Sequence, residues 1–193
     1  NLHRNPLGGR NFECYSEDPF LSGQIAVGFI RGVQGRNVAT TPKHFVANDS
    51  EFERNSIDTQ VDERTLREVY LAPFEQAVTD GDAWGIMSSY NRVNGTFASE
   101  HEWLLGDVLR DQWGFDGFVV SDWFAARSTA ASVRAGLSLE MPGRGRYYGA
   151  EQISLAIDRG EIGEEDLNQI ARDVLAVQER TGVLDGVAAE AER

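Results

Sequence analysis

Short apolar segments that favour β-strands alternate with amphipathic segments that favour helices along this chain of 193 residues. The strand candidates are residues 38–41, 84–90, 118–121 and 137–141, and a predicted helix follows each of them. Such alternation predicts a parallel sheet whose strands are joined by right-handed crossovers. We therefore expect the α/β class, in the form of a partial (β/α)8 TIM-like barrel with about four βα units.

A complete barrel of this kind needs about 250 residues, so about four units make little more than half of one. The chain also begins with Asn1 rather than Met. Both features predict that it is a piece of a longer polypeptide. We expect residues 1–183 to form the barrel portion and residues 184–193, which are small and acidic, to form a linker or tail.

The first predicted helix begins at Asp18-Pro19, because Asp is a favoured N-cap and Pro fits the first helical turn. Apolar residues then recur about every four positions. This period predicts a packing face made of Leu21, Ile25, Phe29 and Val33. In the next helix, Pro73 lies inside the apolar pattern and predicts a kink or a restart.

Composition excludes several classes of partner and site. The formal net charge of -13 argues against binding to nucleic acid or to anionic membranes. No apolar run approaches the ~18 residues of a membrane span. Cys14 is the one cysteine, so no intrachain disulfide is possible and the compartment stays undetermined. We expect no metal, because the three histidines lack ligand spacing, and no cofactor, because no glycine-rich phosphate loop follows a strand.

Polar residues follow each predicted strand: Lys43-His44, Tyr90, Asp122-Trp123 and Glu140. The carboxyl ends of parallel strands meet at one edge of the sheet, where α/β proteins place their sites. The sequence therefore predicts a site built from these residues.

Asp122 has two possible roles at the end of its strand. As a nucleophile it would attack the anomeric carbon of a sugar, with a second carboxyl about 5–5.5 Å away to protonate the leaving oxygen. Alternatively, it would only cap the next helix. The neighbouring Trp123 offers a flat face to a sugar ring or packs in the core.

The cationic residues also have alternatives. Lys43 and His44 would donate hydrogen bonds to sugar hydroxyls, or Lys43 would form a Schiff base as a lyase nucleophile, or both would be a solvated lysine and a core histidine. Arg10 would bind vicinal hydroxyls or pair with a buried carboxylate. Arg54, next to Glu53, suggests a surface ion pair.

The remaining two strand-end residues are Tyr90 and Glu140. Tyr90 would hydrogen-bond the nucleophile and hold it in place, or would simply be an aromatic residue at a strand end. Glu140 would line the floor of the pocket or pair with an arginine.

Five segments in series resemble the catalytic barrel domain of glycoside hydrolase family 3, most closely its β-glucosidases. The segments are Gly8-Gly9-Arg10-Asn11-Phe12-Glu13 with Ser16-Glu17-Asp18-Pro19, Lys43-His44-Phe45, Met87-Ser88-Ser89-Tyr90-Asn91 with Asn94-Gly95, Ser121-Asp122-Trp123, and Leu139-Glu140-Met141-Pro142. Each segment alone is a weak signal. Their common order over residues 1–183 makes the resemblance specific.

The resemblance implies retaining hydrolysis of a non-reducing terminal β-D-glucosyl residue, with Asp122 as the nucleophile that forms a covalent glycosyl intermediate. It also implies that five residues contact the sugar or position the nucleophile. These residues are Arg10, Lys43, His44, Tyr90 and Trp123. The implied partner is a small carbohydrate.

Two parts of the family pattern are missing from the sequence. The first strands of the family's barrel would precede Asn1, and the general acid is a glutamate of a following α/β domain. Residues 46–50 lack the histidine that serves as acid in another branch. We therefore expect the fragment alone not to turn over substrate. A non-catalytic carbohydrate-binding fragment and β-xylosidase specificity remain alternatives.

Overall fold

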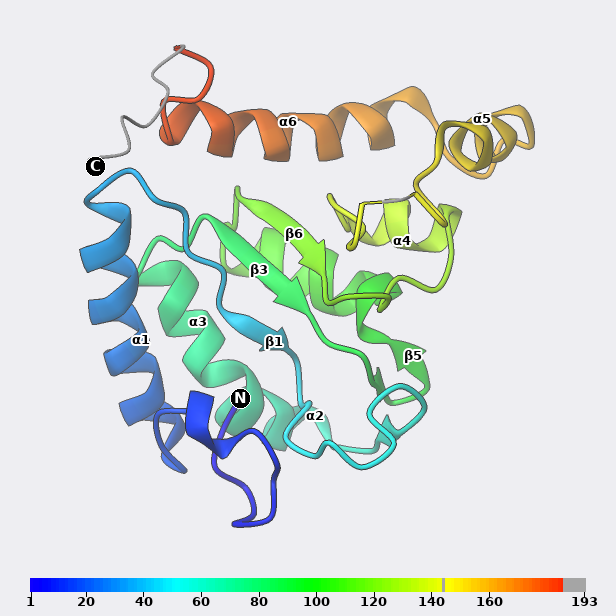
Figure 1. The fold of residues 1–193 in the computed structure, drawn as a ribbon. Coiled ribbons are helices and arrows are strands. Elements are labelled where there is room, and N and C mark those ends of the chain that lie inside the picture. Colours follow the sequence, from blue (N-terminus) through cyan, green and yellow to red (C-terminus); the bar gives the residue numbers. More distant parts are fainter. Residues whose placement is uncertain (144, 186–193) are drawn as a thin grey trace.

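The computed structural model describes residues 1–143 and 145–185. At its centre is a parallel sheet of three strands, β1 (Lys43–Phe45), β3 (Gly85–Ser88) and β6 (Phe118–Ser121), in the order β1-β3-β6 (Figure 1). A single parallel bridge between Val120 and Leu139 extends the sheet beyond β6. Parallel strands joined by helices confirm the predicted α/β class.

The pairing of β3 with β6 is regular and sets the frame of the sheet. Gly85 lies opposite Phe118 and Ser88 opposite Ser121, with no shift of register between them. A Cβ on Gly85 would lie only 2.6 Å from the ring of Phe118, so this position requires glycine. Because both strands end at the same level, the residues that follow Ser88 and Ser121 share one edge of the sheet.

Two of the predicted strands are wrong in position or extent. Residues 38–41 form no strand, and Val38 is 55% exposed; β1 begins instead at Lys43. The sheet bonds explain the shift, because Met87 N donates to Pro42 O (3.1 Å) and Ser89 N donates to Phe45 O (2.8 Å). Residues 137–141 contribute only the bridge at Leu139.

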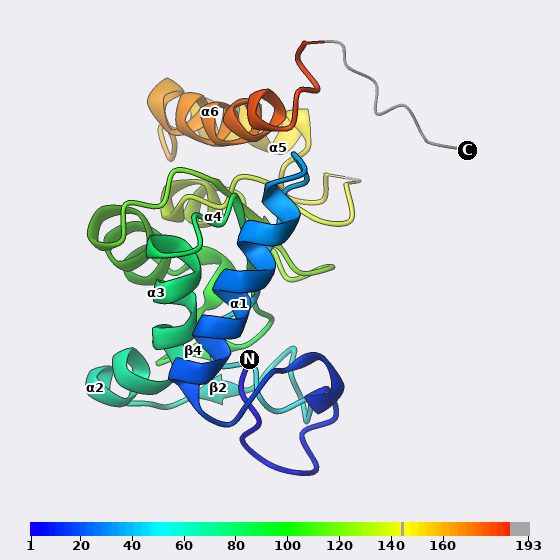
Figure 2. The ribbon, with the colours of Figure 1, turned by 90° about the vertical axis from the view of Figure 1, so that its left-hand side faces the viewer.

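Helices lie on more than one side of the central sheet, as Figures 1 and 2 show. In chain order the main ones are α1 (Pro19–Gln34), α2 (Glu63–Thr65), η2 (Leu66–Leu71), α3 (Ala72–Thr79), η4 (Trp103–Gln112), α4 (Ala130–Ala135), α5 (Ala150–Asp158) and α6 (Glu164–Arg180). Short 3₁₀ turns are η1 (Asn11–Glu13), which precedes α1, and η3 (Ala98–Glu100), which precedes η4. None of the helices in the described ranges combines the length and hydrophobicity needed to cross a membrane.

Helix α1 begins as predicted, since the Asp18 carboxylate accepts hydrogen bonds from Phe20 N (2.8 Å) and Leu21 N (3.1 Å). Its predicted packing face is wrong. Leu21, Ile25 and Phe29 are 47%, 40% and 59% exposed. The buried residues are Ser22, Gly23, Val27, Ile30 and Gln34.

Close packing of α1 against α3 explains why the buried face of α1 differs from the predicted one. A Cβ on Gly23 would lie 2.5 Å from the side-chain nitrogen of Gln76, so the small residues of α1 allow the approach. Pro73 lies where the sequence predicted a kink or restart. It stands in the first turn of α3, directly after the π-helical segment η2, so the helix changes from π to α hydrogen bonding at this point.

A second, small sheet was not predicted. It has the order β2-β4-β5 and consists of β2 (Asp58–Thr59), β4 (Arg92–Val93) and β5 (Thr96–Phe97). The hairpin turns at Asn94-Gly95, where both residues have positive φ, as a tight hairpin turn requires. The amide of Asn91 donates to Val46 O (3.2 Å) and so ties this small sheet to the end of β1.

Helix α6 is anchored to the sheet by a buried charge. The carboxylate of Asp173 is 2% exposed and accepts hydrogen bonds from Arg110 Nη2 (2.7 Å), Ser138 Oγ (2.8 Å) and Gln169 Nε2 (3.0 Å). The division at residue 183 stays a prediction, because residues 186–193 of the expected tail lie outside the described residues.

Candidate active site

Asp122 lies directly after β6, at the carboxyl end of the sheet. Its amide donates to Ser88 O (3.1 Å), so the strand pairing continues one residue past the strand and fixes the backbone. Oδ1 accepts a hydrogen bond from Trp123 N at 2.7 Å, and the residue is 8% exposed. The helix-cap alternative is wrong, because the next helix, α4, begins only at Ala130.

His44 faces the other oxygen of this carboxylate. Its Nε2 lies 3.3 Å from Asp122 Oδ2, and the residue is 1% exposed. Burial, reinforced by the charges of Arg10 and Lys43, lowers the pKa of His44 to about 2, so the imidazole is neutral at physiological pH.

Asn1 defines the tautomer of this neutral imidazole. Asn1 Nδ2 lies 3.3 Å from His44 Nδ1, and an amide nitrogen can only donate. Nδ1 is therefore the acceptor and Nε2 carries the hydrogen. Within the described part of the chain, no hydrogen bond of good geometry satisfies Nε2, although Asp122 is near. An N–H donor is thus aimed at the space around Asp122.

Tyr90 completes the immediate surroundings of Asp122. It is 6% exposed, and its hydroxyl interacts with the Asp122 carboxylate. Burial first, and then this interaction, raise the pKa of Tyr90 to about 12. The side chain is therefore a phenol, and a donor, throughout the neutral range.

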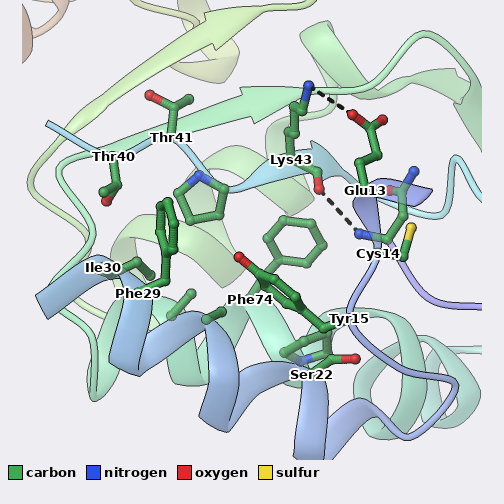
Figure 3. Close-up of a pocket in the computed structure, with 15 residues that line it drawn as sticks. Glu13, Cys14, Tyr15, Ser22, Phe29, Ile30, Thr40, Thr41, Lys43 and Phe74 are labelled. Atoms are coloured by element: carbon green, nitrogen blue, oxygen red, sulfur yellow. Dashed lines mark hydrogen bonds and ion pairs between the residues drawn. The ribbon is translucent and has the colours of Figure 1, made fainter. Parts of the chain in front are cut away.

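A belt of alternating charges lies beside this group. Glu13 Oε1 is 2.5 Å from Arg10 Nε, and Glu13 Oε2 is 3.3 Å from Lys43 Nζ. Figure 3 shows Glu13 and Lys43 pointing toward each other above the chain's first segment. Glu51 continues the belt, 3.8 Å from Arg10 Nη1 and 2.6 Å from Arg54 Nη1.

The sequence did not predict the observed roles of three members of this belt. Glu13 and Glu51 were not predicted as site residues, and Arg54 was expected to form a surface pair. Arg54 does form an ion pair, with Glu51, but the pair is partly buried and the guanidinium also lies 4.6 Å from the centroid of the Tyr90 ring. The available signal was the spacing of three residues in Arg10-x-x-Glu13 and Glu51-x-x-Arg54, which places opposite charges side by side in a tight turn.

Lys43 has an electrostatic partner in this belt. Its side chain is 41% exposed and pairs as an ammonium with Glu13. A Schiff-base lysine instead requires a free amine. The contact therefore does not favour the lyase alternative.

Two hollows border the site. One, of about 490 Å³, is lined by Trp123, Phe124, Arg146 and Tyr147, among others. Trp123 and Phe124 are 55% and 65% exposed, so Trp123 is not a core residue. Phe124 also has a φ of 65°, a conformation that non-glycine residues rarely adopt.

Glu140 shapes the far side of this hollow. Its carboxylate accepts hydrogen bonds from Tyr147 N (3.0 Å) and Tyr148 N (2.9 Å). Glu140 therefore lines the pocket, as one alternative had it, and its own partners are backbone amides.

The other hollow, of about 260 Å³, lies between the first segment, α1 and β1 (Figure 3). Its walls are mostly apolar, with Phe29, Ile30 and Phe74 on one side and Lys43 at the rim. Among residues 1–143 and 145–185, no group of three or more His, Cys, Asp or Glu side chains is arranged to hold a metal ion.

Comparison with known proteins gives a consistent result. The family model described as "Glycosyl hydrolase family 3 N terminal domain" matches residues 1–177. A β-glucosidase of Rhizobium radiobacter is 54% identical over 185 residues, which are 96% of this chain and 22% of that protein. An exo-α-(1->6)-L-arabinopyranosidase of Bifidobacterium longum is 46% identical over 181 residues, 94% of this chain and 24% of that protein.

Solved structures agree with the sequence matches. β-Glucosidase 3B from Thermotoga neapolitana, determined in complex with glucose, has a TM-score of 0.92 and 46% identity, over 96% of this chain and 27% of that chain. The likeness confirms that the fold is part of a TIM-like barrel. The chain spans only about a quarter of the length of the relatives that it matches.

Proposed function

Because this chain belongs to glycosyl hydrolase family 3, we propose that it supplies the nucleophile half of the active site of a retaining β-glycosidase that removes terminal β-D-glucosyl residues. One observation carries the proposal. A buried carboxylate at the end of β6 accepts a hydrogen bond from Trp123 N and interacts with the Tyr90 hydroxyl, while the N–H of neutral His44 points into the same space.

The chemistry follows from this arrangement. The Asp122 carboxylate attacks the anomeric carbon and forms an ester bond, the bond from that carbon to the leaving oxygen breaks, and an acid gives the leaving oxygen a proton. Water, losing a proton to the same group, then attacks the anomeric carbon and releases Asp122. The two displacements retain the configuration of the sugar.

Four side chains hold the sugar in this proposal. His44 Nε2–H, the Lys43 ammonium and the Arg10 guanidinium donate to its hydroxyls, and the exposed face of Trp123 packs against its ring. Both cations keep free hydrogens while paired with Glu13, because an ammonium carries three donors and a guanidinium five.

The acid that protonates the leaving oxygen is proposed to come from outside residues 1–193. Glu13 and Glu51, the carboxylates of the charge belt, are engaged by Arg10, Lys43 and Arg54. The short coverage of the relatives supports a contribution from the rest of the protein. The proposed substrate of that whole protein is a small β-glucoside or oligosaccharide.

The sugar is proposed as glucose because several of the similar proteins are named β-glucosidase, and several of the similar solved structures hold glucose. The arabinopyranosidase relatives show that comparable identity accompanies another sugar in other proteins. β-Glucoside, β-xyloside and α-L-arabinopyranoside substrates should therefore be tested side by side.

The decisive experiment uses the full-length gene product and an activated 2-deoxy-2-fluoro-β-glucoside. We expect the intact mass to rise by one fluoroglucosyl group and peptide mapping to place it on Asp122. Asp122→Asn should abolish labelling and lower kcat by at least about a thousandfold, while glucose binding persists.

Asp116→Asn is the matched control, because Asp116 is an exposed aspartate just before the opposite end of the same strand. It should label and turn over as the wild type does. A label on another carboxylate, or a normal kcat in Asp122→Asn, contradicts the assignment. Glucose binding without label or turnover would favour the carbohydrate-binding alternative.

A further inference from the structure

Glu51 lies between two guanidinium groups from different parts of the chain. Its Oε2 accepts a hydrogen bond from Arg54 Nη1 at 2.6 Å, and its Oε1 lies 3.8 Å from Arg10 Nη1. The three side chains are 25%, 35% and 23% exposed, respectively, so the pairs are less screened than those of a free surface. Glu51 is thus the shared anion of two partly buried cations.

One arm of this arrangement reaches the proposed nucleophile. The Arg54 guanidinium lies over the Tyr90 ring, 4.6 Å from its centroid, and the Tyr90 hydroxyl interacts with the Asp122 carboxylate. The stacked cation restricts the ring, and the ring orients the hydroxyl. A contact path therefore runs from Glu51 through Arg54 and Tyr90 to Asp122.

The other arm reaches the proposed sugar-binding cations. Arg10 is held by Glu13 on one side and by Glu51 on the other, and Glu13 also pairs with Lys43. Backbone packing supports this arm, because a Cβ on Gly9 would lie only 3.1 Å from Glu51 Cγ. Gly9 has a φ of 81°, which suits glycine and lets the loop press on the stem of Glu51.

Charge balance gives Glu51 a further role. Without its carboxylate, Arg10 and Arg54 would lose their shared anion, and the carboxylates left in the site would be Glu13, which already pairs with Arg10 and Lys43, and Asp122. A guanidinium that forks onto Asp122 would occupy the lone pairs that must attack the sugar. Glu51 Oε1 is buried and has no hydrogen-bond partner among the described residues, and its ion-pair contact is with Arg10 Nη1 at 3.8 Å.

We propose that Glu51 is a positioning residue of this site, which holds Arg54 on Tyr90 and Arg10 beside the sugar and keeps both guanidinium groups from pairing with Asp122. The proposal rests on the function proposed above. Glu51 touches neither substrate nor the reacting atoms; it acts through the two arginines.

The test is a double-mutant cycle in the full-length gene product. Glu51→Gln removes the charge and keeps the shape, and Arg54→Met removes the next member of the path while keeping an apolar stem. Each should lower kcat/KM for a chromogenic β-glucoside by about tenfold and slow the fluoroglucoside labelling of Asp122 by a similar factor.

The kcat/KM of the double variant should be no lower than that of the slower single variant, because both changes interrupt the same contact path from Glu51 to Asp122. Glu53→Gln, an exposed neighbour in the same loop, should match the wild type in every measurement. Arg54→Met keeps the test open if Glu51→Gln folds poorly.

The proposal would be overturned, while the proposed function stands, by a Glu51→Gln kcat/KM within about twofold of the wild type. It would also be overturned if the losses of kcat/KM in the two single variants multiply in the double variant. A lowered melting temperature with unchanged labelling would mean a purely structural role and would overturn it as well. A wild-type protein that neither labels nor turns over a glycoside would overturn the proposed function itself, and this inference with it.

Discussion

Tyr90→Phe removes a single oxygen atom from the site and so isolates one hydrogen bond. The ring, its 6% exposure and its stacking with Arg54 all remain. What is lost is the hydroxyl that interacts with the Asp122 carboxylate. Hydrogen bonds to charged groups contribute about 1.5–3 kcal/mol, which at about 1.4 kcal/mol per factor of ten corresponds to about a 10–150-fold loss.

We expect this loss in kcat/KM for a β-glucoside, with little change in the Kd for glucose, because Tyr90 orients the nucleophile rather than the sugar. The size of the loss should not vary with pH in the range where the enzyme is stable. Burial and Asp122 raise the pKa of Tyr90 to about 12, so the phenol keeps its proton there. Steady-state kinetics at several pH values measure both features.

Tyr148→Phe provides the control. The Tyr148 hydroxyl donates to Leu137 O at 2.6 Å, so this variant also deletes one tyrosine hydrogen bond, but away from Asp122. It should lower the free energy of unfolding by about 1 kcal/mol and leave kcat/KM unchanged. A Tyr90→Phe enzyme within threefold of the wild type, or a loss that disappears at one end of the pH range, would refute the role given to Tyr90.

Two further predictions concern stability. Burial lowers the pKa of His44 to about 2, so below its ordinary value of about 6.5 the unfolded chain binds a proton that the folded chain does not. The free energy of unfolding should fall by up to about 1.4 kcal/mol per pH unit as the pH drops below about 6.5. Chemical denaturation should show a shallower fall in His44→Gln, and equal slopes would contradict the assignment of a buried neutral imidazole. Asp173→Ala should cost about 3–5 kcal/mol, because it leaves the charge of Arg110 without its buried partner. Asp116→Ala, which breaks an exposed pair with Arg180, should cost under about 1 kcal/mol, and equal melting temperatures for these two variants would count against the buried network.

Much of the fold was predicted from residues that are neighbours in the sequence. Strand β6 and the buried core of β3 follow from runs of apolar residues, and the start of α1 follows from Asp18-Pro19. Each of these depends on residues adjacent in the chain. The shift of the first strand to Lys43 does not, because it is set by the partner amides of Met87 and Ser89.

The packing face of α1 shows the same limit. Its period of about four predicted one helix face, yet the helix buries the neighbouring face, where Gly23 meets Gln76 of α3. Periodicity reports where apolar residues lie on a helix. Which face is covered depends on the neighbour that approaches it.

The position of the candidate site was likewise readable from the sequence, because polar residues after parallel strands must gather at one edge. Asp122 and Tyr90 follow this rule, after β6 and β3, whereas His44 lies inside β1 rather than after the predicted strand. The contact that joins the two halves of the charge belt was not readable from the sequence, because Glu51 and Arg10 lie about forty residues apart and pair only after the loops fold together.

The sequence by itself thus determined the alternation of strands and helices, the residues that follow β3 and β6, and the family to which they point. Only the tertiary structure decided the state of those residues. The neutral form of His44, the donor role of Tyr90 and the position of Arg54 all depend on burial and on charges brought from distant segments. Burial and electrostatic pairing are properties of distances in space, and spacing along the chain does not contain them.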